Sequence, residues 1–100
     1  MNEYQRLLNA AKRLRDQYPE GTRIMCLDMN DQYNPVPSGT RGTVIDVDDM
    51  ATIHVAWDNG SGLGLAYGED SYRKLTQEEI EEESQTEDIS DEDDSMTMNM

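Results

Sequence analysis

Few residues of this chain carry reactive groups, and their positions do not combine them into a catalytic site. His54 is the one histidine and Cys26 the one cysteine. His54 occupies an outward position in an alternating strand pattern, whereas a lone cysteine in an apolar strand is usually a small core residue. No serine stands in a nucleophile-elbow context, and no Ser-His-Asp arrangement is indicated. We therefore expect that the protein is not an enzyme and has no catalytic residues.

Two runs resemble ligand-binding motifs without completing them. Residues 28–31 begin like a calcium loop, but Tyr33 stands sixth, where the loop needs glycine, and Gly39 twelfth, where it needs glutamate. The glycine-rich residues 60–64 follow a turn and open a strand, so no helix N-terminus follows them to bind phosphate. We predict neither a metal nor a cofactor. A cluster of three aspartates could hold a cation weakly, but we interpret it as a set of solvated turn residues: Asp46, Asp48 and Asp49.

Charge divides the chain into a folded part and an acidic tail. The formal net charge is −14, and residues 76–100 hold 11 Asp and Glu with no Lys or Arg. This segment has too few apolar side chains to offset the entropy of ordering it, so we predict disorder. With no secretory signal and no membrane-spanning stretch in view, we expect a cytoplasmic protein with no membrane contact. The expected units are a helix at 1–18, a β-barrel at 19–75 and the tail at 76–100.

Residues 1–18 show the period of an amphipathic helix. Apolar side chains recur every three or four positions from Tyr4 to Tyr18, and we expect this stripe to close one end of the barrel. Asn2 and Gln5 are spaced as a capping box, and Pro19 marks the stop. The other faces carry a basic cluster that we interpret as solvated rather than as a contact surface, and the net charge makes direct nucleic-acid binding unattractive. The cluster consists of Arg6, Lys12, Arg13 and Arg15.

From residue 22 the apolar period changes to two, which is typical of strands. The pattern is clearest where Ile53, Val55 and Trp57 face inward. Asn59-Gly60 then favours a type I′ hairpin, because both central residues of that turn need positive φ. Closing a short sheet removes its edges, so we predict a mainly β fold: a small SH3-like five-stranded antiparallel barrel with an N-terminal helix. Its strands are expected at residues 22–27, 40–47, 52–57, 61–67 and 71–75.

The sequence also resembles a known group of proteins. Gly39-Thr40-Arg41-Gly42-Thr43-Val44 and Ile53-His54-Val55-Ala56-Trp57-Asp58-Asn59-Gly60 resemble the glycine-bracketed strand entry and V-x-W-D-x-G pattern of many SH3-like barrels. Residues 18–24, 67–70 and 73–75 resemble an uncharacterised small barrel family, a domain of unknown function, of phages and bacterial mobile elements. The resemblance covers about residues 18–75. It implies a fold and a mobile-element setting, with no activity and no site residues to transfer.

Protein binding is the function that these features favour. The long loop after the first strand offers four residues to an extended peptide, namely Tyr33, Pro35, Val36 and Pro37. Alternation instead places Trp57 and Tyr67 in the core. The acidic residues could mimic a DNA backbone and occupy the basic channel of a host nuclease, because opposite charge steers association. The candidate contact residues are Tyr33, Pro35, Asp46, Asp48, Asp49, Asp58, Glu69 and Asp70.

Three hypotheses about the partner follow. The preferred one is a non-enzymatic module of phage or mobile-element origin that inhibits a bacterial defence nuclease such as a CRISPR effector, as anti-CRISPR proteins do. The second is an accessory or regulatory protein of the element that binds peptides or self-associates. The third and weakest is a nucleic-acid binder that uses the basic helix face.

Overall fold

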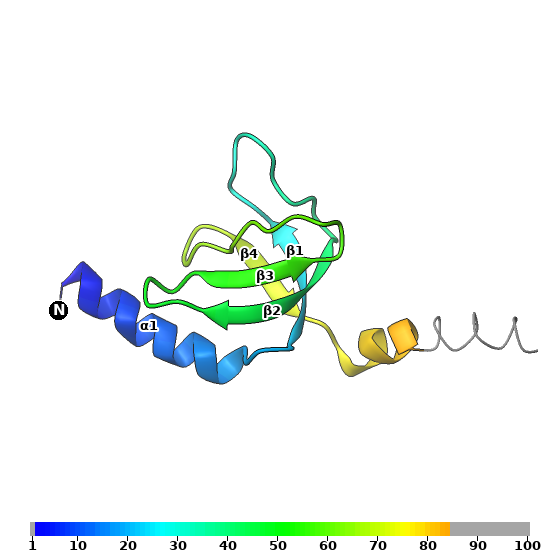
Figure 1. Cartoon of the computed structure of the whole chain (residues 1–100), viewed down its shortest axis with the longest axis horizontal. Helices are drawn as coiled ribbons and strands as arrows, with labels where there is room; N and C mark the ends of the chain where they lie inside the picture. Colours follow the sequence, from blue (N-terminus) through cyan, green and yellow to red (C-terminus); the bar gives the residue numbers. More distant parts are fainter. Residues whose placement is uncertain (1, 85–100) are drawn as a thin grey trace, which may run out of the picture.

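The computed structural model describes residues 2–84. Helix α1 (Glu3–Gln17) precedes four strands, and a second helix covers residues 77–84. The strands form one open antiparallel sheet in the order β3-β2-β1-β4, and α1 packs against β2 (Figure 1). Within these residues no helix is both long and apolar enough to cross a membrane. The strands are β1 (Arg23–Asp28), β2 (Arg41–Val47), β3 (Ile53–Trp57) and β4 (Ser71–Lys74).

The open sheet differs from the five-stranded barrel that the sequence predicted. The strand expected at residues 61–67 is reduced to one bridge, in which Leu65 and Ile53 exchange backbone hydrogen bonds of 2.9 and 3.1 Å. Just before it, the indole Nε1 of Trp57 donates to the carbonyl oxygen of Leu63 at 2.8 Å. The indole of Trp57 therefore occupies the Leu63 carbonyl oxygen, which a backbone N–H of a neighbouring strand would otherwise bind, and strand pairing stops after one residue.

The hairpin after β3 stands where the sequence placed it, but its turn type is different. Gly60 has φ +92°, while Asn59 is not among the residues with positive φ. Gly60 N–H donates to the carbonyl oxygen of Trp57 at 2.9 Å, and Trp57 N–H donates to that of Ser61 at 3.3 Å. This is a three-residue loop that ends in a left-handed glycine. The type I′ assignment was therefore wrong.

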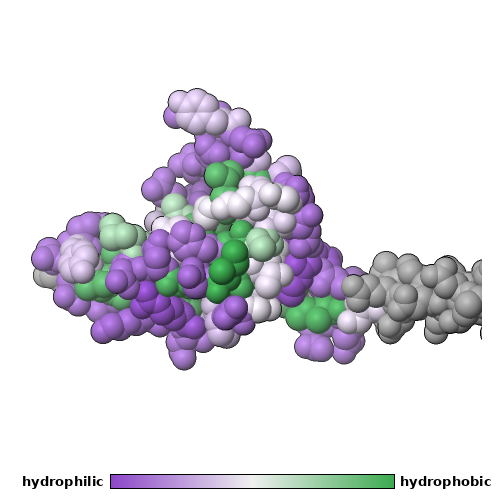
Figure 2. Space-filling model, viewed as in Figure 1, coloured by the Kyte–Doolittle hydropathy of each residue, from purple (hydrophilic) through white to green (hydrophobic). Residues whose placement is uncertain are grey.

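The core lies between α1 and one face of the sheet. Ile53, Val55 and Trp57 are at most 4% exposed, and Cys26 is fully buried, as the alternation predicted. Figure 2 shows that hydrophilic side chains cover most of this face of the molecule and that apolar side chains reach the surface in separate patches. Tyr67 is 43% exposed, so its predicted place in the core was wrong. The alternation that would bury it ends with the single bridge at Leu65.

Helix α1 begins with the predicted cap. The side chain of Asn2 accepts a hydrogen bond from Gln5 N–H at 2.7 Å. Its buried residues are Ala10, Ala11 and Leu14, of which Ala11 and Leu14 belong to the predicted stripe. The stripe is shorter than predicted, because Tyr4 is 59% exposed.

Gly42 on β2 leaves space for the aromatic side chain of the neighbouring strand. A Cβ at this position would lie 2.7 Å from Cε3 of Trp57 and 2.7 Å from Cγ1 of Val55. Real side chains essentially never approach so closely in a packed core. The glycine is therefore required by packing rather than by its backbone angles.

Residues 76–84 depart from the disordered tail that we predicted from residue 76 onward. Thr76 Oγ1 accepts a hydrogen bond from Glu79 N–H at 3.1 Å, and Glu79 Oε1 accepts one from Thr76 N–H at 2.9 Å. This reciprocal pair is a capping box, and the helix of residues 77–84 follows it. The rest of the predicted tail, residues 85–100, lies outside the described residues.

Candidate functional site

The loop of residues 29–40 projects from the sheet (Figure 1) and is fixed at its base. Val36, which the sequence offered to a peptide, is instead 2% exposed and anchors the returning half of the loop in the core. The two carboxylate oxygens of Asp70, in the turn before β4, accept hydrogen bonds from Asn30 N–H at 2.7 Å and from Ala66 N–H at 2.8 Å. Asp70, a predicted contact residue, therefore joins the loop to a turn 40 residues away from Asn30.

The tip of this loop presents the two predicted contact residues that are not acidic. The carboxylate of Asp31 accepts hydrogen bonds of 3.3 Å from the N–H groups of Tyr33 and Asn34 and so fixes the tip. Tyr33 is 88% exposed, and Pro35 is exposed beside it. Tyrosine offers a large contact area at a low cost in side-chain entropy, because it has only two side-chain torsions. The loop is therefore the candidate contact site of the molecule.

Asp48 is a structural acceptor in the turn between β2 and β3. Its carboxylate accepts hydrogen bonds from Met50 N–H at 2.9 Å and Thr52 N–H at 3.0 Å, and it lies 2.8 Å from His54 Nε2. Partial burial opposes its ionisation, but the bonds to His54, Thr52 and Met50 outweigh this and lower the pKa of Asp48. The outward imidazole that the sequence predicted thus packs against a turn carboxylate.

Asp49 and Asp58 are both engaged by arginines. Arg15 of α1 donates to Asp49 at 2.6 Å and to the carbonyl oxygen of Val47 at 2.9 Å, which fastens the helix to the turn. Arg23 of β1 donates to both oxygens of Asp58, at 2.9 and 2.7 Å, and this lowers the pKa of Asp58. Part of the basic helix cluster and part of the predicted acidic surface therefore neutralise each other within the fold.

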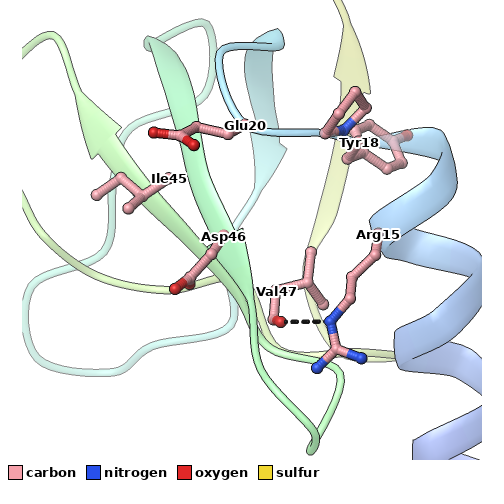
Figure 3. Close-up of a pocket in the computed structure, with 7 residues that line it drawn as sticks. Arg15, Tyr18, Glu20, Ile45, Asp46 and Val47 are labelled. Atoms are coloured by element: carbon pink, nitrogen blue, oxygen red, sulfur yellow. Dashed lines mark hydrogen bonds between the residues drawn. The ribbon is translucent and has the colours of Figure 1, made fainter.

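Asp46 and Glu69 are the predicted acidic residues that stay exposed without such contacts. Among residues 2–84 no hydrogen bond or ion pair joins the side chain of either one to a neighbour. Asp46 lies at the edge of an open hollow of about 310 Å³ between the end of α1 and β2, with Glu20 and the half-exposed Ile45 beside it (Figure 3). Two carboxylates next to an apolar side chain suit a cationic side chain of a partner.

A surface that sequence reasoning missed lies on the outer face of the sheet. Met25 of β1 pairs with Arg41 on one side and with Arg73 on the other, so these three residues form a row across the strands. Arg23 stands two residues before Met25 and therefore points to the same side, in the next row. We call Arg23, Arg41 and Arg73 the arginine face.

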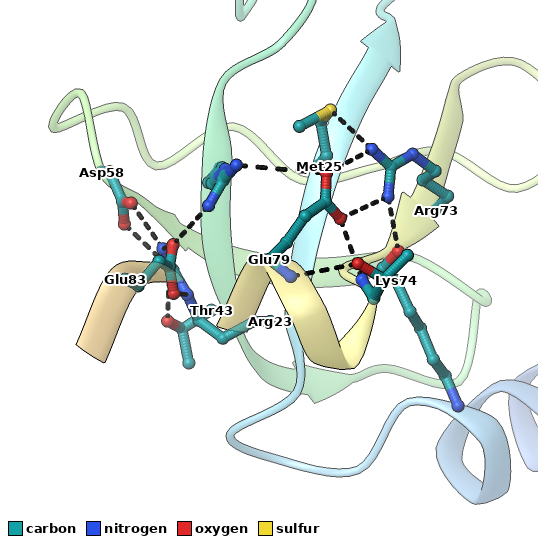
Figure 4. A network of polar contacts seen from close by, with 10 residues as sticks. Arg23, Met25, Thr43, Asp58, Arg73, Lys74, Glu79 and Glu83 are labelled. Carbon is teal, nitrogen blue, oxygen red and sulfur yellow. Dashed lines mark hydrogen bonds and ion pairs between the residues drawn. The ribbon is translucent and has the colours of Figure 1, made fainter. Parts of the chain in front are cut away.

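The helix of residues 77–84 lies on the arginine face (Figure 4). Arg73 donates to both oxygens of Glu79 at 2.8 Å, and this lowers the pKa of Glu79 to about 2. One turn later, Glu83 accepts hydrogen bonds of 3.2 Å from Arg23 Nε and from Arg41 Nη1, and its pKa is lowered as well. The Thr-x-x-Glu spacing at residues 76–79 was a local sign of this helix, because it is the capping-box pattern.

A comparison with protein families now identifies the domain. A model described as "Domain of unknown function (DUF4314)" matches residues 8–75, more than half of the chain. The chain belongs to the DUF4314 family. No curated protein matches it. The DUF4314 domain includes all four strands, the projecting loop and the arginine face, whereas Glu79 and Glu83 lie beyond the matched residues.

The described residues of and around the DUF4314 domain offer little for metal chemistry. Within residues 2–84 no three His, Cys, Asp or Glu side chains are grouped so that they could hold a metal ion. The Cys26 thiol is buried, and burial raises its pKa, which disfavours the reactive thiolate. Three surface features stand out among the described residues: the loop tip, the hollow beside Asp46 and the arginine face.

Proposed function

We propose that this DUF4314 protein is a non-catalytic protein-binding module that engages its partner through the tip of the loop of residues 29–40. The observation that carries the proposal is an internally braced loop that leaves Tyr33 88% exposed. Tyrosine is enriched at the centres of protein interfaces, where it buries area while its hydroxyl stays hydrogen-bonded. An ordered loop that exposes such a side chain supports a binding role.

In its sharper form, the protein comes from a phage or mobile element and inhibits a bacterial defence nuclease, such as a CRISPR effector, in the host cytoplasm. The net charge of −14 supports it, since a strongly acidic molecule is steered toward a basic DNA channel. The exposed carboxylates of Asp46 and Glu69 are the predicted acidic residues best placed for direct contact. The carboxylates that are paired with arginines contribute less to the negative electrostatic potential around the protein.

The open sheet is a reduced SH3-like barrel in this proposal. Three features support the relationship: one long loop after β1, a tight hairpin after β3, and a short final strand that returns to pair with β1. The bridge between Ile53 and Leu65 stands where a further barrel strand would run. The long loop borders the peptide groove in SH3-like domains, which agrees with a contact role for Tyr33.

A pull-down from bacterial lysate tests the proposal when it compares two matched tyrosine variants. Tyr33→Ala removes the tyrosine of the loop tip, and Tyr4→Ala removes an exposed tyrosine of α1 as the control. We expect the wild type and Tyr4→Ala to retain the same protein and Tyr33→Ala to lose it. Equal retention by all three proteins would overturn the loop as the contact site.

The identity of the retained protein then separates the hypotheses. For a defence inhibitor, it is a nuclease whose DNA binding the protein blocks, with potency that falls as salt rises. For an accessory protein, it is encoded by the mobile element, or it is a second copy of this chain. A direct shift of labelled DNA by the purified protein would instead support nucleic-acid binding and contradict both.

A further inference from the structure

The arginine face and the helix that covers it have matching spacings. Glu79 and Glu83 are four residues apart, so their carboxylates stand on one side of the helix, about 6 Å apart along its axis. The two rows of the face are two residues apart on β1, which is about 7 Å. Glu79 therefore meets the row of Arg73 and Arg41, which lie 2.8 and 4.0 Å from its carboxylate. Glu83 meets Arg23 of the next row and also reaches back to Arg41.

The contacts are partly shielded from water, which makes them selective. The side chains of Arg23 and Arg41 are 21% and 27% exposed, and those of Glu79 and Glu83 are 20% and 29% exposed. Guanidinium groups bind carboxylates in fixed, often bidentate geometry, so the positions of these arginines favour carboxylates at matching positions.

The covering helix is short, and two of its glutamates bind the arginines of the sheet. Its described part spans residues 77–84, two turns, and isolated helices of this length are marginal in water. Ion pairs near a protein surface contribute little each, so a competing segment with the same charges can replace this one. The arginines belong to the DUF4314 domain, as does Asp58, which also binds Arg23, whereas Glu79 and Glu83 lie outside it.

We propose that the arginine face is a binding site for an acidic helix of another protein that carries two carboxylates four residues apart. Residues 76–84 of the same chain occupy this site. An acidic helix of another protein must therefore displace them before it can bind. An acidic helix is favoured over nucleic acid because the segment that occupies the face is itself an acidic helix. This site is separate from the loop tip and does not depend on the function proposed for it.

The test uses the full chain and two variants that remove the same charge. Glu79→Gln with Glu83→Gln releases the arginine face, while Glu78→Gln with Glu81→Gln alters two exposed glutamates of the same helix. The probe is a fluorescent peptide of residues 75–84 with blocked ends, and its binding is measured by anisotropy. We expect the first variant to bind the peptide about tenfold more tightly than the wild type or the second variant does, because its own helix no longer competes for the arginines. Equal binding by both variants would overturn the proposal.

Two further measurements guard against trivial outcomes. Adding Arg73→Gln to the first variant should remove the gain in peptide affinity, and loss of the gain would show that binding uses the face. Thr76→Ala keeps every charge but removes the helix cap, so it should also raise peptide affinity. A single-stranded oligonucleotide is tested in the same way. If it binds the first variant more tightly than the peptide does, the ligand of the site is a phosphate backbone and not an acidic helix, and the assignment is overturned.

Discussion

Arg73 of β4 donates hydrogen bonds of 2.8 Å to both carboxylate oxygens of Glu79, six residues later in the chain. The same glutamate closes the capping box with Thr76. One side chain therefore both begins the helix of residues 77–84 and fastens it to the sheet. The most acidic part of the described chain thus starts as an ordered element that neutralises the sheet's arginines.

Acid should detach this helix before it unfolds the core. The pKa of Glu79 is lowered from 4.5 to about 2, so its contribution to docking is complete above about pH 4.5 and is lost as the pH falls toward 2. The amide resonance of Ile80, whose N–H bonds to the carbonyl oxygen of Thr76, reports the change. In Glu79→Gln the resonance should already lie near its acidic position at pH 7. An Ile80 resonance that is constant from pH 5 to pH 2 in the wild type would contradict the ion pair.

Gly42→Ala should destabilise the fold by about 1–3 kcal/mol, because the new Cβ would overlap Trp57 and Val55 in a packed core. Gly62→Ala is the matched control, since a Cβ there meets nothing within 4 Å and φ at that residue is not positive. Urea denaturation followed by Trp57 fluorescence measures both free energies of unfolding. Equal values for the two variants would show that β2 and β3 are not packed as described.

Asp48→Ala should cost about 1–2 kcal/mol, because it leaves the backbone N–H groups of Met50 and Thr52 without their acceptor. Asp46→Ala removes a carboxylate two residues away that has no such role, and its free energy of unfolding should stay close to the wild-type value. The comparison is made by urea denaturation at pH 7. If Asp46→Ala proved the more harmful of the two, the assignment of Asp48 as the turn's acceptor would be wrong.

The two halves of the projecting loop should respond differently to truncation. Tyr33→Ala should change the free energy of unfolding by less than about 0.5 kcal/mol, since the side chain is almost fully exposed. Val36→Ala should cost about 1–3 kcal/mol, because it empties a buried position. Thermal unfolding by circular dichroism distinguishes them. A large loss of stability in Tyr33→Ala would mean that this tyrosine serves the fold and not a partner.

Short-range patterns predicted the parts of the fold that depend on neighbouring residues. The alternation of Ile53, Val55 and Trp57 identified β3, and Asn2 with Gln5 identified the start of α1. The strand expected at residues 61–67 could not be judged this way, because its pairing stops where the indole of Trp57 takes the carbonyl oxygen of Leu63. That competition depends on the turn between them, which no alternating pattern reveals.

The roles of the acidic residues could not be read from the sequence because their partners are distant. Asp70 bonds to a residue 40 positions away, and Glu83 to one 60 positions away. The sequence suggested a disordered acidic tail and a set of acidic residues open to a partner. The fold instead directs several of these carboxylates to arginines and backbone N–H groups, and it leaves Tyr33, Asp46 and Glu69 outside.

Hydrogen exchange at the amide of Ile80 tests the central claim most directly, namely that residues 76–84 lie on the arginine face. We expect this amide to exchange more slowly than in a free peptide of residues 75–84. Arg73→Gln should remove most of this protection. Lys12→Gln, which alters an exposed cation of α1, should leave the protection unchanged. Exchange at the free-peptide rate in the wild type, or equal protection in both variants, would contradict it.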